Sequence, residues 1–103
     1  MLTYENISFT EYKIKIAKQD HHLIDVRTEA EFNEESIPTA QNIPLHLLPI
    51  RISGLAKKPI VFYCRSGARS SMACQFTKNN YNFPDIFNLA GGVLELPPDW
   101  KTN

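Results

Sequence analysis

Short apolar runs alternate with amphipathic segments along this chain. Residues 23–26 ("LIDV") and 60–64 ("IVFYC") are brief, nearly continuous and rich in β-branched or aromatic side chains. Such runs are typical of strands buried on both faces of a parallel sheet. Residues 85–89 are a third candidate strand, and residues 6–8 and 41–43 are weaker ones. Strands alternating with helices at this spacing predict a parallel α/β sheet with helices on both faces.

Two capping boxes mark the starts of helices. Residues 8–11 ("SFTE") and 28–31 ("TEAE") each place a hydroxyl three positions before a glutamate, so that both side chains satisfy free backbone N–H groups. The first box predicts a helix through about Lys18, and the second predicts a short helix that Pro38 terminates. The predicted apolar face of the first helix comprises Phe9, Tyr12 and Ile16.

Two further segments have helical character. Residues 44–55 are interrupted by Pro49 and Gly54, which predicts a short or distorted helix. Another helix is expected to begin inside or just after residues 61–71. Its predicted apolar stripe comprises Ala68, Met72, Ala73 and Phe76.

Length and charge narrow the class of protein. The 103 residues fit one domain, with a core at about 4–95 and a tail at 96–103 that either covers the site or hangs loose. Eleven Lys+Arg balance eleven Asp+Glu, which gives no basic footprint for nucleic acid or for a membrane surface. Residues 1–13 lack a signal-peptide layout, and no apolar run reaches membrane-spanning length. We therefore expect a cytoplasmic protein.

Cysteine and histidine usage argues against disulfides and metals. Cys64 and Cys74 are too few for a disulfide framework and fit a reducing compartment. His21, His22 and His46 do not fall into ligand spacings with either cysteine. No metal or organic cofactor is expected.

The stretch "VFYCRSGARSS" (61–71) carries the candidate chemistry. Ligands of open α/β sheets bind beyond the carboxyl ends of the strands, which is where Cys64 falls. There it faces the free N–H groups of a helix N-terminus, beside Arg65 and Arg69, so its thiol pKa should be low. Gly67 allows the backbone to curl into an anion-binding nest. Small Ser66 and Ala68 leave its centre open. The alternative is an inert, buried cysteine at a strand end, which two nearby arginines argue against.

Three segments together resemble the single-domain rhodanese (thiosulfate sulfurtransferase) family. They are "LIDVRTEAEFNEESIPTAQNIPL", "IVFYCRSGARS" and "NLAGG", in the family order over residues 4 to 95 or so. The resemblance implies a rhodanese-like, five-stranded parallel sheet with Cys64 as the catalytic nucleophile. It further implies that Cys64 takes the outer sulfur of thiosulfate or a similar anionic donor as a persulfide. Cyanide or a thiol then accepts that sulfur.

The resemblance also assigns roles around the nucleophile. The backbone N–H groups of residues 65–69 would cradle the persulfide, and the guanidinium groups of Arg65 and Arg69 would hold the anionic donor. Asp25, Arg27 and Glu31 match the family's charged positions, for which we expect a supporting role through capping and salt bridges. Gly91 and Gly92 are expected to permit a tight turn and a close backbone approach near the loop.

The sequence departs from the family at the edges of the site. Residues 35–37 ("ESI") stand where Gly-His-Ile is usual, and Thr39 replaces a common glycine. The tryptophan usually found after the double glycine is Leu96 here, with Trp100 four residues later. These departures leave donor preference and access to the site open.

Cys74 could be a resolving cysteine or a packing residue. If a helix runs from about Gly67 to Cys74, that stretch alone rises on the order of 10 Å. A disulfide with Cys64 needs Cα atoms within about 7 Å. We therefore expect Cys74 to pack within the helix.

Other functions fit parts of this pattern. A phosphatase or arsenate reductase would use a cysteine–arginine loop one residue longer than that between Cys64 and Arg69. A non-catalytic binding module would be expected to lack the nucleophile. A persulfide carrier that serves a sulfur-relay protein needs the same loop as a thiosulfate-dependent enzyme, so the sequence leaves these two open.

Overall fold

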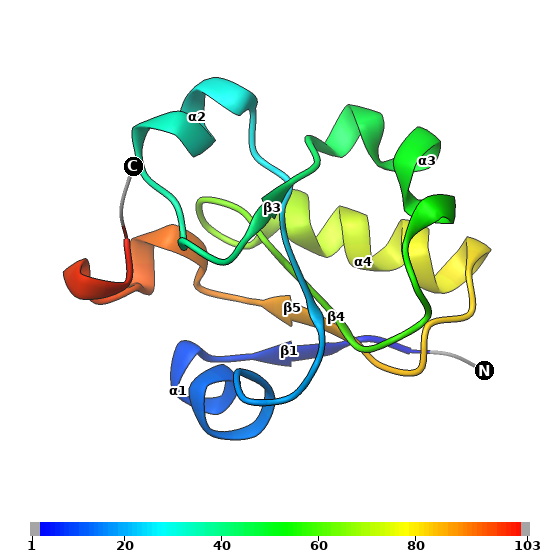
Figure 1. Ribbon diagram of the computed structural model, residues 1–103, viewed down its shortest axis with the longest axis horizontal. Helices are drawn as coiled ribbons and strands as arrows, with labels where there is room; N and C mark the ends of the chain where they lie inside the picture. Colours follow the sequence, from blue (N-terminus) through cyan, green and yellow to red (C-terminus); the bar gives the residue numbers. More distant parts are fainter. Residues whose placement is uncertain (1–2, 102–103) are drawn as a thin grey trace.

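The fold is built on one sheet of five parallel strands (Figure 1). The structure is a computed structural model and describes residues 3–101. The strands are β1 (Glu5–Ile7), β2 (His22–Asp25), β3 (Gln41–Asn42), β4 (Ile60–Tyr63) and β5 (Ile86–Leu89). They lie in the order β1-β5-β4-β2-β3. The predicted fold class is confirmed, and all five candidate runs form strands.

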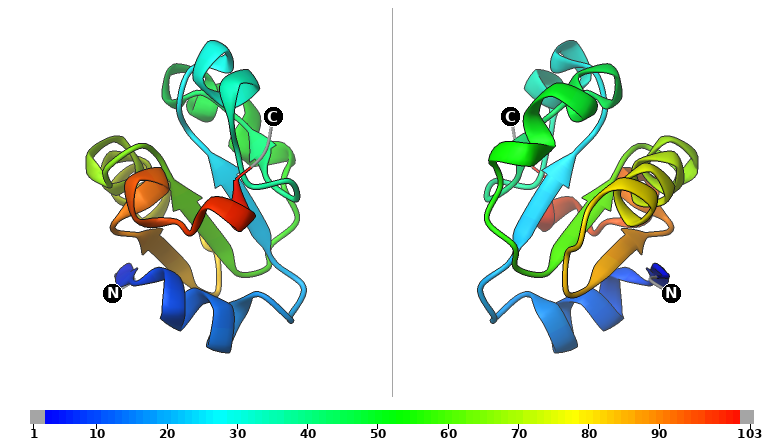
Figure 2. Two further views of the ribbon diagram at one scale, coloured as in Figure 1. Left: turned by 90° about the vertical axis from the view of Figure 1, so that its left-hand side faces the viewer. Right: turned by 90° about the vertical axis from the view of Figure 1, so that its right-hand side faces the viewer.

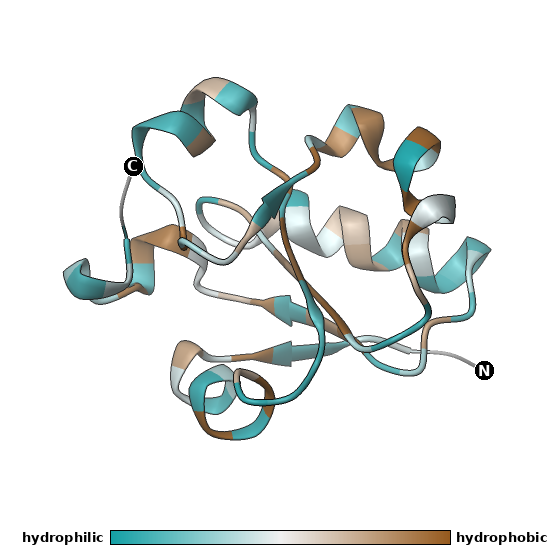
Figure 3. Cartoon of the chain, viewed as in Figure 1, coloured by the Kyte–Doolittle hydropathy of each residue, from teal (hydrophilic) through white to brown (hydrophobic). Residues whose placement is uncertain are grey.

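Strand β4 lies at the centre of the sheet, and all four of its side chains are buried. Ile60 and Phe62 belong to one core cluster, and Val61 and Tyr63 belong to the other, on the opposite face. This alternation explains the continuous apolar run, because successive side chains point to opposite faces and both faces are covered. Figure 3 shows the resulting band of hydrophobic residues along β4.

The helix predicted over residues 8–18 forms only in part. Its capping box is confirmed at Ser8, but the α-helix α1 (Phe9–Glu11) is followed by a π-helical turn, η1 (Tyr12–Ile16). The widened turn is closed by a bond from the N–H of Ala17 to the carbonyl of Tyr12, at 2.9 Å. Tyr12 and Ile16 both remain buried, so the predicted face is kept although the helix ends earlier.

The second capped helix also ends early. The capping box at Thr28 is confirmed, yet α2 (Glu29–Glu34) stops well before Pro38, which therefore does not terminate it. The backbone of Glu35 is extended, and its carbonyl accepts a 2.6 Å hydrogen bond from Nη2 of Arg27. The chain then buries Ile37, whose N–H donates to the Tyr63 hydroxyl at 3.2 Å. Tertiary contacts, rather than proline, end this helix.

The segment 44–55 is broken as predicted, into two 3₁₀ turns on either side of the short helix α3 (Leu48–Arg51). The long helix α4 (Ala68–Asn80) lies with α3 on one side of the sheet, and α1 lies on the other (Figure 2). The stripe predicted for α4 is wrong at Ala68 and Met72, which are exposed. The buried face of α4 is Ser70, Ala73, Cys74 and Thr77. Its small residues allow α4 to pack closely on the sheet.

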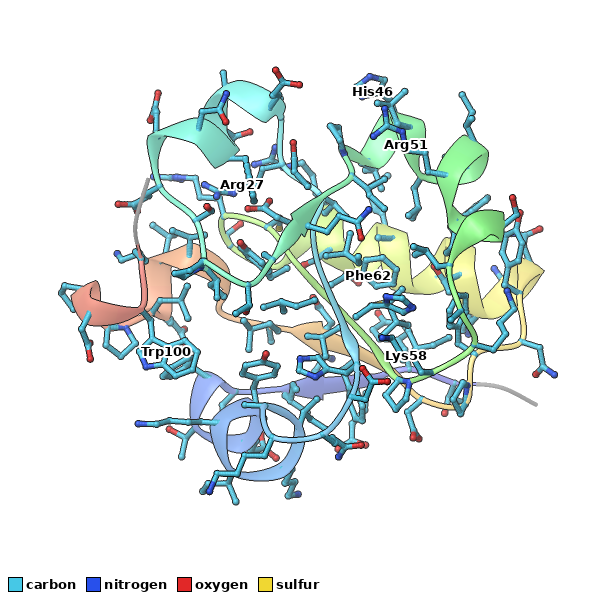
Figure 4. All side chains as sticks on the ribbon, in the orientation of Figure 1. Arg27, His46, Arg51, Lys58, Phe62 and Trp100 are labelled. Atoms are coloured by element: carbon cyan, nitrogen blue, oxygen red, sulfur yellow. The ribbon has the colours of Figure 1, made fainter. Side chains whose placement is uncertain are left out.

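The C-terminal segment packs against the domain as far as the structure describes it. Trp100 meets Phe9 edge to face, with ring centroids 4.8 Å apart, beside α1 (Figure 4). Leu96 is buried in the core cluster against which Phe9 and Trp100 pack. Nζ of Lys101 lies 3.7 Å from Oε1 of Glu35. Residues 96–101 are therefore docked, whereas the last two residues of the predicted tail lie outside the described residues. Within residues 3–101, no helix has the length and apolar character needed to cross a membrane.

A buried ion pair joins Asp25, the last residue of β2, to Arg27. Asp25 has no solvent exposure and accepts hydrogen bonds from the backbone N–H of Arg27 at 2.9 Å and from its Nη2 at 2.7 Å. Arg27 is 4% exposed. Removing one partner of a buried pair leaves a desolvated charge, which is far more costly than losing a pair at the surface.

We expect Asp25→Asn to lower the free energy of unfolding by about 3 kcal/mol, since it leaves the buried Arg27 uncompensated. Urea denaturation at neutral pH measures the change. The matched control is Asp20→Asn, which breaks the pair of Lys58 with an exposed carboxylate and should barely move the midpoint. Equal effects of the two substitutions would contradict the buried pairing.

Candidate active site

Cys64 is the first residue beyond β4, and α4 begins four residues later. The turn between them depends on Gly67, whose φ of 104° is rarely adopted by residues with a side chain. A Cβ at Gly67 would also collide with the carbonyl of Ala90. This turn directs the free N–H groups of the α4 N-terminus toward the Cys64 side chain.

The sulfur of Cys64 is buried among hydrogen-bond donors. Its Sγ lies 3.1 Å from the backbone N of Gly67 and 3.4 Å from that of Ser70. The Ser70 hydroxyl is also 3.4 Å away. Burial raises the pKa of the Cys64 thiol, but hydrogen bonds from Ser70, Gly67 and Ser66 outweigh it and lower the pKa below its ordinary value. The thiolate of Cys64 is therefore easier to form than that of an ordinary cysteine.

The segment after β5 supports the loop from outside. The N–H groups of Val93 and Leu94 donate to the carbonyls of Cys64 and Arg65, at 3.0 and 3.1 Å. A side chain on Gly92 would meet those same carbonyls, and its φ is 59°. The predicted close backbone approach at the double glycine is confirmed for Gly92. With the carbonyls of Cys64 and Arg65 engaged in this way, the N–H of Gly67 is left to donate to the sulfur.

Arg69 is tied to a carboxylate. Its Nη1 and Nη2 donate to Oε1 and Oε2 of Glu31, at 2.7 and 3.0 Å. Glu31 also completes the Thr28 capping box. The hydrogen bonds from Arg69 are the main reason that the pKa of Glu31 falls to about 2, although partial burial opposes the shift. The predicted supporting salt bridges are therefore present, as Arg27–Asp25 and Arg69–Glu31.

A cleft of about 500 Å³ lies next to the loop. Its lining residues are Arg27, Glu31, Glu34, Glu35, Arg65, Val93, Leu94 and Lys101. Arg65 is exposed, while Arg27 and Arg69 are held by carboxylates. Arg27, which lines this cleft, lies beneath α2 (Figure 4). Ser66 and Ala68 are also exposed, so no large side chain closes the loop from outside.

The structure brings most of the predicted site residues together. Residues 64–69 form one turn, Glu31 joins it through Arg69, and the Asp25–Arg27 pair lies one strand away. The hydroxyl of Ser70, which lies 3.4 Å from the sulfur, and the amide of Asn88, which contacts that hydroxyl, were not predicted from the sequence. An asparagine inside the otherwise apolar strand β5 was the available signal.

Cys74 lies apart from this chemistry. It is a free thiol with no solvent exposure, and its Sγ donates to the carbonyl of Phe87 at 3.4 Å. Burial raises its pKa, so the thiol stays protonated. Across residues 3–101, no group of three or more His, Cys, Asp or Glu side chains is placed to hold a metal ion.

The comparison with protein families is decisive about the class. The model described as the rhodanese-like domain matches residues 8–96, and the chain therefore belongs to that family. A sulfurtransferase of Allochromatium vinosum is 43% identical over 77 residues, which cover 74% of this chain and 71% of that protein. An adenylyltransferase and sulfurtransferase of Drosophila yakuba is 34% identical over 88% of this chain, which spans only 22% of that protein.

Solved structures share the fold. A Staphylococcus saprophyticus protein superposes with a TM-score of 0.83 at 28% identity, covering 96% of this chain and 99% of the other. An Escherichia coli protein described as a rhodanese with anions gives a TM-score of 0.65 at 29% identity, covering 82% and 99%. The chain is thus a member of the rhodanese-like sulfurtransferase family.

We expect Glu31→Gln to destabilise the protein at neutral pH by no more than about 1 kcal/mol, because the pair with Arg69 is partly exposed. Glutamine keeps the capping contact with Thr28 and removes only the charge. A depressed carboxyl pKa stabilises the fold above its ordinary value of 4.5, and the benefit is lost as pH falls toward about 2. Urea unfolding from pH 7 to pH 3 should therefore show the difference from wild type shrinking.

The matched control is Glu29→Gln, which removes another acidic residue of the same helical turn. It should show a much smaller difference at neutral pH. A difference for Glu31→Gln that does not change with pH would contradict the ionic pairing with Arg69.

Proposed function

We propose that this protein transfers sulfane sulfur from thiosulfate, or a similar anionic donor, to a thiophilic acceptor through a persulfide on Cys64. One observation carries the proposal. The Cys64 sulfur faces two backbone N–H groups, at 3.1 and 3.4 Å, at the N-terminus of α4. Such preformed donors stabilise a sulfur anion without reorganisation.

The first half-reaction is a displacement at sulfur. The Cys64 thiolate attacks the outer sulfur of thiosulfate and forms a new S–S bond. The S–S bond of thiosulfate breaks, and sulfite leaves with the electron pair. The negative charge then resides on the outer sulfur of the persulfide, where the N–H groups of Arg65, Ser66, Gly67, Ala68 and Arg69 would cradle it.

The second half-reaction returns the thiolate. Cyanide, or an acceptor thiol in its thiolate form, attacks the outer sulfur. The product is thiocyanate or a new persulfide, and the electron pair of the breaking S–S bond returns to Cys64. No metal or organic cofactor is needed for either step. Because the nucleophile must remain a free thiolate, the proposal places the reaction in a reducing compartment such as the cytoplasm.

Arg65 is the cation best placed to receive the donor. Arg69 is held by Glu31 and Arg27 by Asp25, whereas Arg65 is exposed at the cleft. Lys101 lines the same cleft and has only the longer, 3.7 Å contact with Glu35. Arg69 would then act at longer range, through its charge near the Cys64 sulfur.

A protein could replace either small molecule. A persulfide carrier would receive sulfur from, or deliver it to, a sulfur-relay partner through the same loop. The Drosophila relative, of which this chain spans 22%, supports that alternative, since a matching segment there is part of a larger adenylyltransferase and sulfurtransferase. Such a carrier would turn over thiosulfate poorly and accept sulfur readily from a persulfidated protein.

Thiosulfate should add one sulfur atom to the reduced protein, as measured by intact mass, with release of sulfite. Cys64→Ser should abolish the addition because it removes the nucleophile. Cys74→Ser is the control and should still take up sulfur, since Cys74 is buried away from the loop. Absence of an adduct from thiosulfate, polysulfide and a persulfidated protein would refute the proposal, and an adduct from the protein donor alone would favour the carrier.

Arg65→Gln should raise the KM for thiosulfate by about tenfold, because one charge-assisted contact to the anion is lost. Steady-state sulfite or thiocyanate release measures the change. Arg51→Gln is the control, since Arg51 is an exposed arginine on α3 that does not line the cleft (Figure 4). An unchanged KM for Arg65→Gln would exclude Arg65 as the donor-binding cation.

A further inference from the structure

A hydrogen-bond network of three polar side chains, Ser70, Asn88 and Asn6, begins at the Cys64 sulfur. Ser70 on α4 has no solvent exposure, and Asn88 on β5 is 3% exposed. The Ser70 hydroxyl lies 2.6 Å from Oδ1 of Asn88, and Nδ2 of Asn88 lies 3.0 Å from Oδ1 of Asn6 on β1. This network thus links Cys64 to the neighbouring strands β5 and β1.

The orientation of the Asn88 amide follows from its neighbours. The carbonyl of Gly67 can only accept a hydrogen bond, and Nδ2 of Asn88 lies 3.4 Å from it. Nδ2 is therefore the end that faces Gly67 and Asn6. Oδ1 of Asn88, which can only accept, is left facing the Ser70 hydroxyl.

The Ser70 hydroxyl has one proton and three neighbours that could receive it. Oδ1 of Asn88 is 2.6 Å away, the carbonyl of Gly67 is 3.2 Å away and Sγ of Cys64 is 3.4 Å away. The shortest contact gives the proton to Asn88. A lone pair of the hydroxyl then faces the sulfur, which suits a thiol that donates its S–H but not a thiolate.

We propose that Asn88 is a positioning residue that draws the Ser70 hydroxyl proton away from Cys64 and thereby opposes ionisation of the thiol. When Cys64 ionises, the hydroxyl must rotate to donate to the sulfur. Oδ1 of Asn88 then loses its donor in a buried place, which is costly. The backbone N–H groups favour the thiolate, and Asn88 limits how strongly it is favoured.

The competition between Cys64 and Asn88 for the Ser70 proton also affects how readily Cys64 carries a sulfur atom, a consequence that rests on the proposed function. In a persulfide the negative charge moves to the outer sulfur, so Sγ no longer needs the Ser70 proton. The hydroxyl can then return to Asn88. The network therefore stabilises the loaded protein relative to the empty thiolate.

The other groups around Cys64 do not compete for this proton. The titratable and charged groups on the elements that surround it are Arg69, Cys74 and Lys78 on α4, His22 and Asp25 on β2 with Arg27 just after it, Tyr63 on β4, Arg65 in the loop, and Glu95 beyond β5. Arg69 and Arg27 are paired with carboxylates. Burial raises the pKa values of Cys74 and Tyr63, so both stay neutral. None of these side chains makes a hydrogen bond to Ser70.

The test is a thiol titration without any sulfur donor, in a Cys74→Ala background so that Cys64 alone reports. The rate of alkylation by iodoacetamide and the ultraviolet absorbance of the thiolate are followed against pH. Asn88→Leu removes the acceptor and frees the Ser70 proton. It should raise the thiolate fraction about tenfold at a fixed pH below the pKa. Asn88→Asp, a stronger acceptor, should lower that fraction.

Each variant is repeated with Ser70→Ala, because the effect must pass through the hydroxyl. The Asn88→Leu effect should then vanish, and the Asn88→Asp effect should shrink. An unchanged titration in a folded Asn88→Leu protein, or equal shifts with and without Ser70, would overturn the proposal. If circular dichroism shows that Asn88→Leu does not fold, the Asn88→Asp pair decides by the same criterion. Since no sulfur donor is present, the result is independent of whether thiosulfate loads Cys64.

Discussion

The structure depends on how the Cys64 sulfur, which water hardly reaches, is supplied with hydrogen-bond donors. Cys64 is 1% exposed, which by itself disfavours its charged form. The turn at Gly67 resolves this conflict by bringing free N–H groups of the α4 N-terminus to within hydrogen-bond distance of Sγ. The open turn and the tight contacts that support it from Ala90 and Gly92 all serve this one requirement. The sulfur is thus stabilised by the Ser70 side chain and by backbone N–H groups, whose position is fixed by the fold.

The arginines near the Cys64 loop differ in whether a carboxylate pairs with them. Two of the three arginines near the loop are neutralised, Arg27 by Asp25 and Arg69 by Glu31. The pairs fix α2 and the end of β2 beside α4, so they give rigidity to the walls of the cleft. Arg65 is left exposed at its edge. An anion entering the cleft would therefore meet Arg65 and Lys101 in its lining and N–H donors at the Cys64 sulfur.

Local patterns in the sequence were reliable guides where the physics is local. The capping boxes at Ser8 and Thr28 formed because their partners lie three residues apart. The ends of the same helices were mispredicted, since α2 stops where the carbonyl of Glu35 meets Arg27 and η1 widens to bury Tyr12 and Ile16 together. On α4 the sequence favoured a stripe through Ala68 and Met72, but the sheet packs against a face that includes Ala73 and is turned toward Ser70, Cys74 and Thr77, where small side chains allow close packing.

The sequence by itself determined the strands, the parallel α/β class and the position of Cys64 between a strand and a helix, because these follow from hydrophobic patterning and from residues adjacent in the chain. Only the tertiary structure decided which arginine is free, since Glu31 reaches Arg69 across 38 positions. It also placed Asn88 and Asn6 behind Ser70 by pairing β5 with β1, strands from opposite ends of the chain. Hydrogen bonds between distant residues depend on strand order, and strand order is a property of the packed sheet rather than of any single segment.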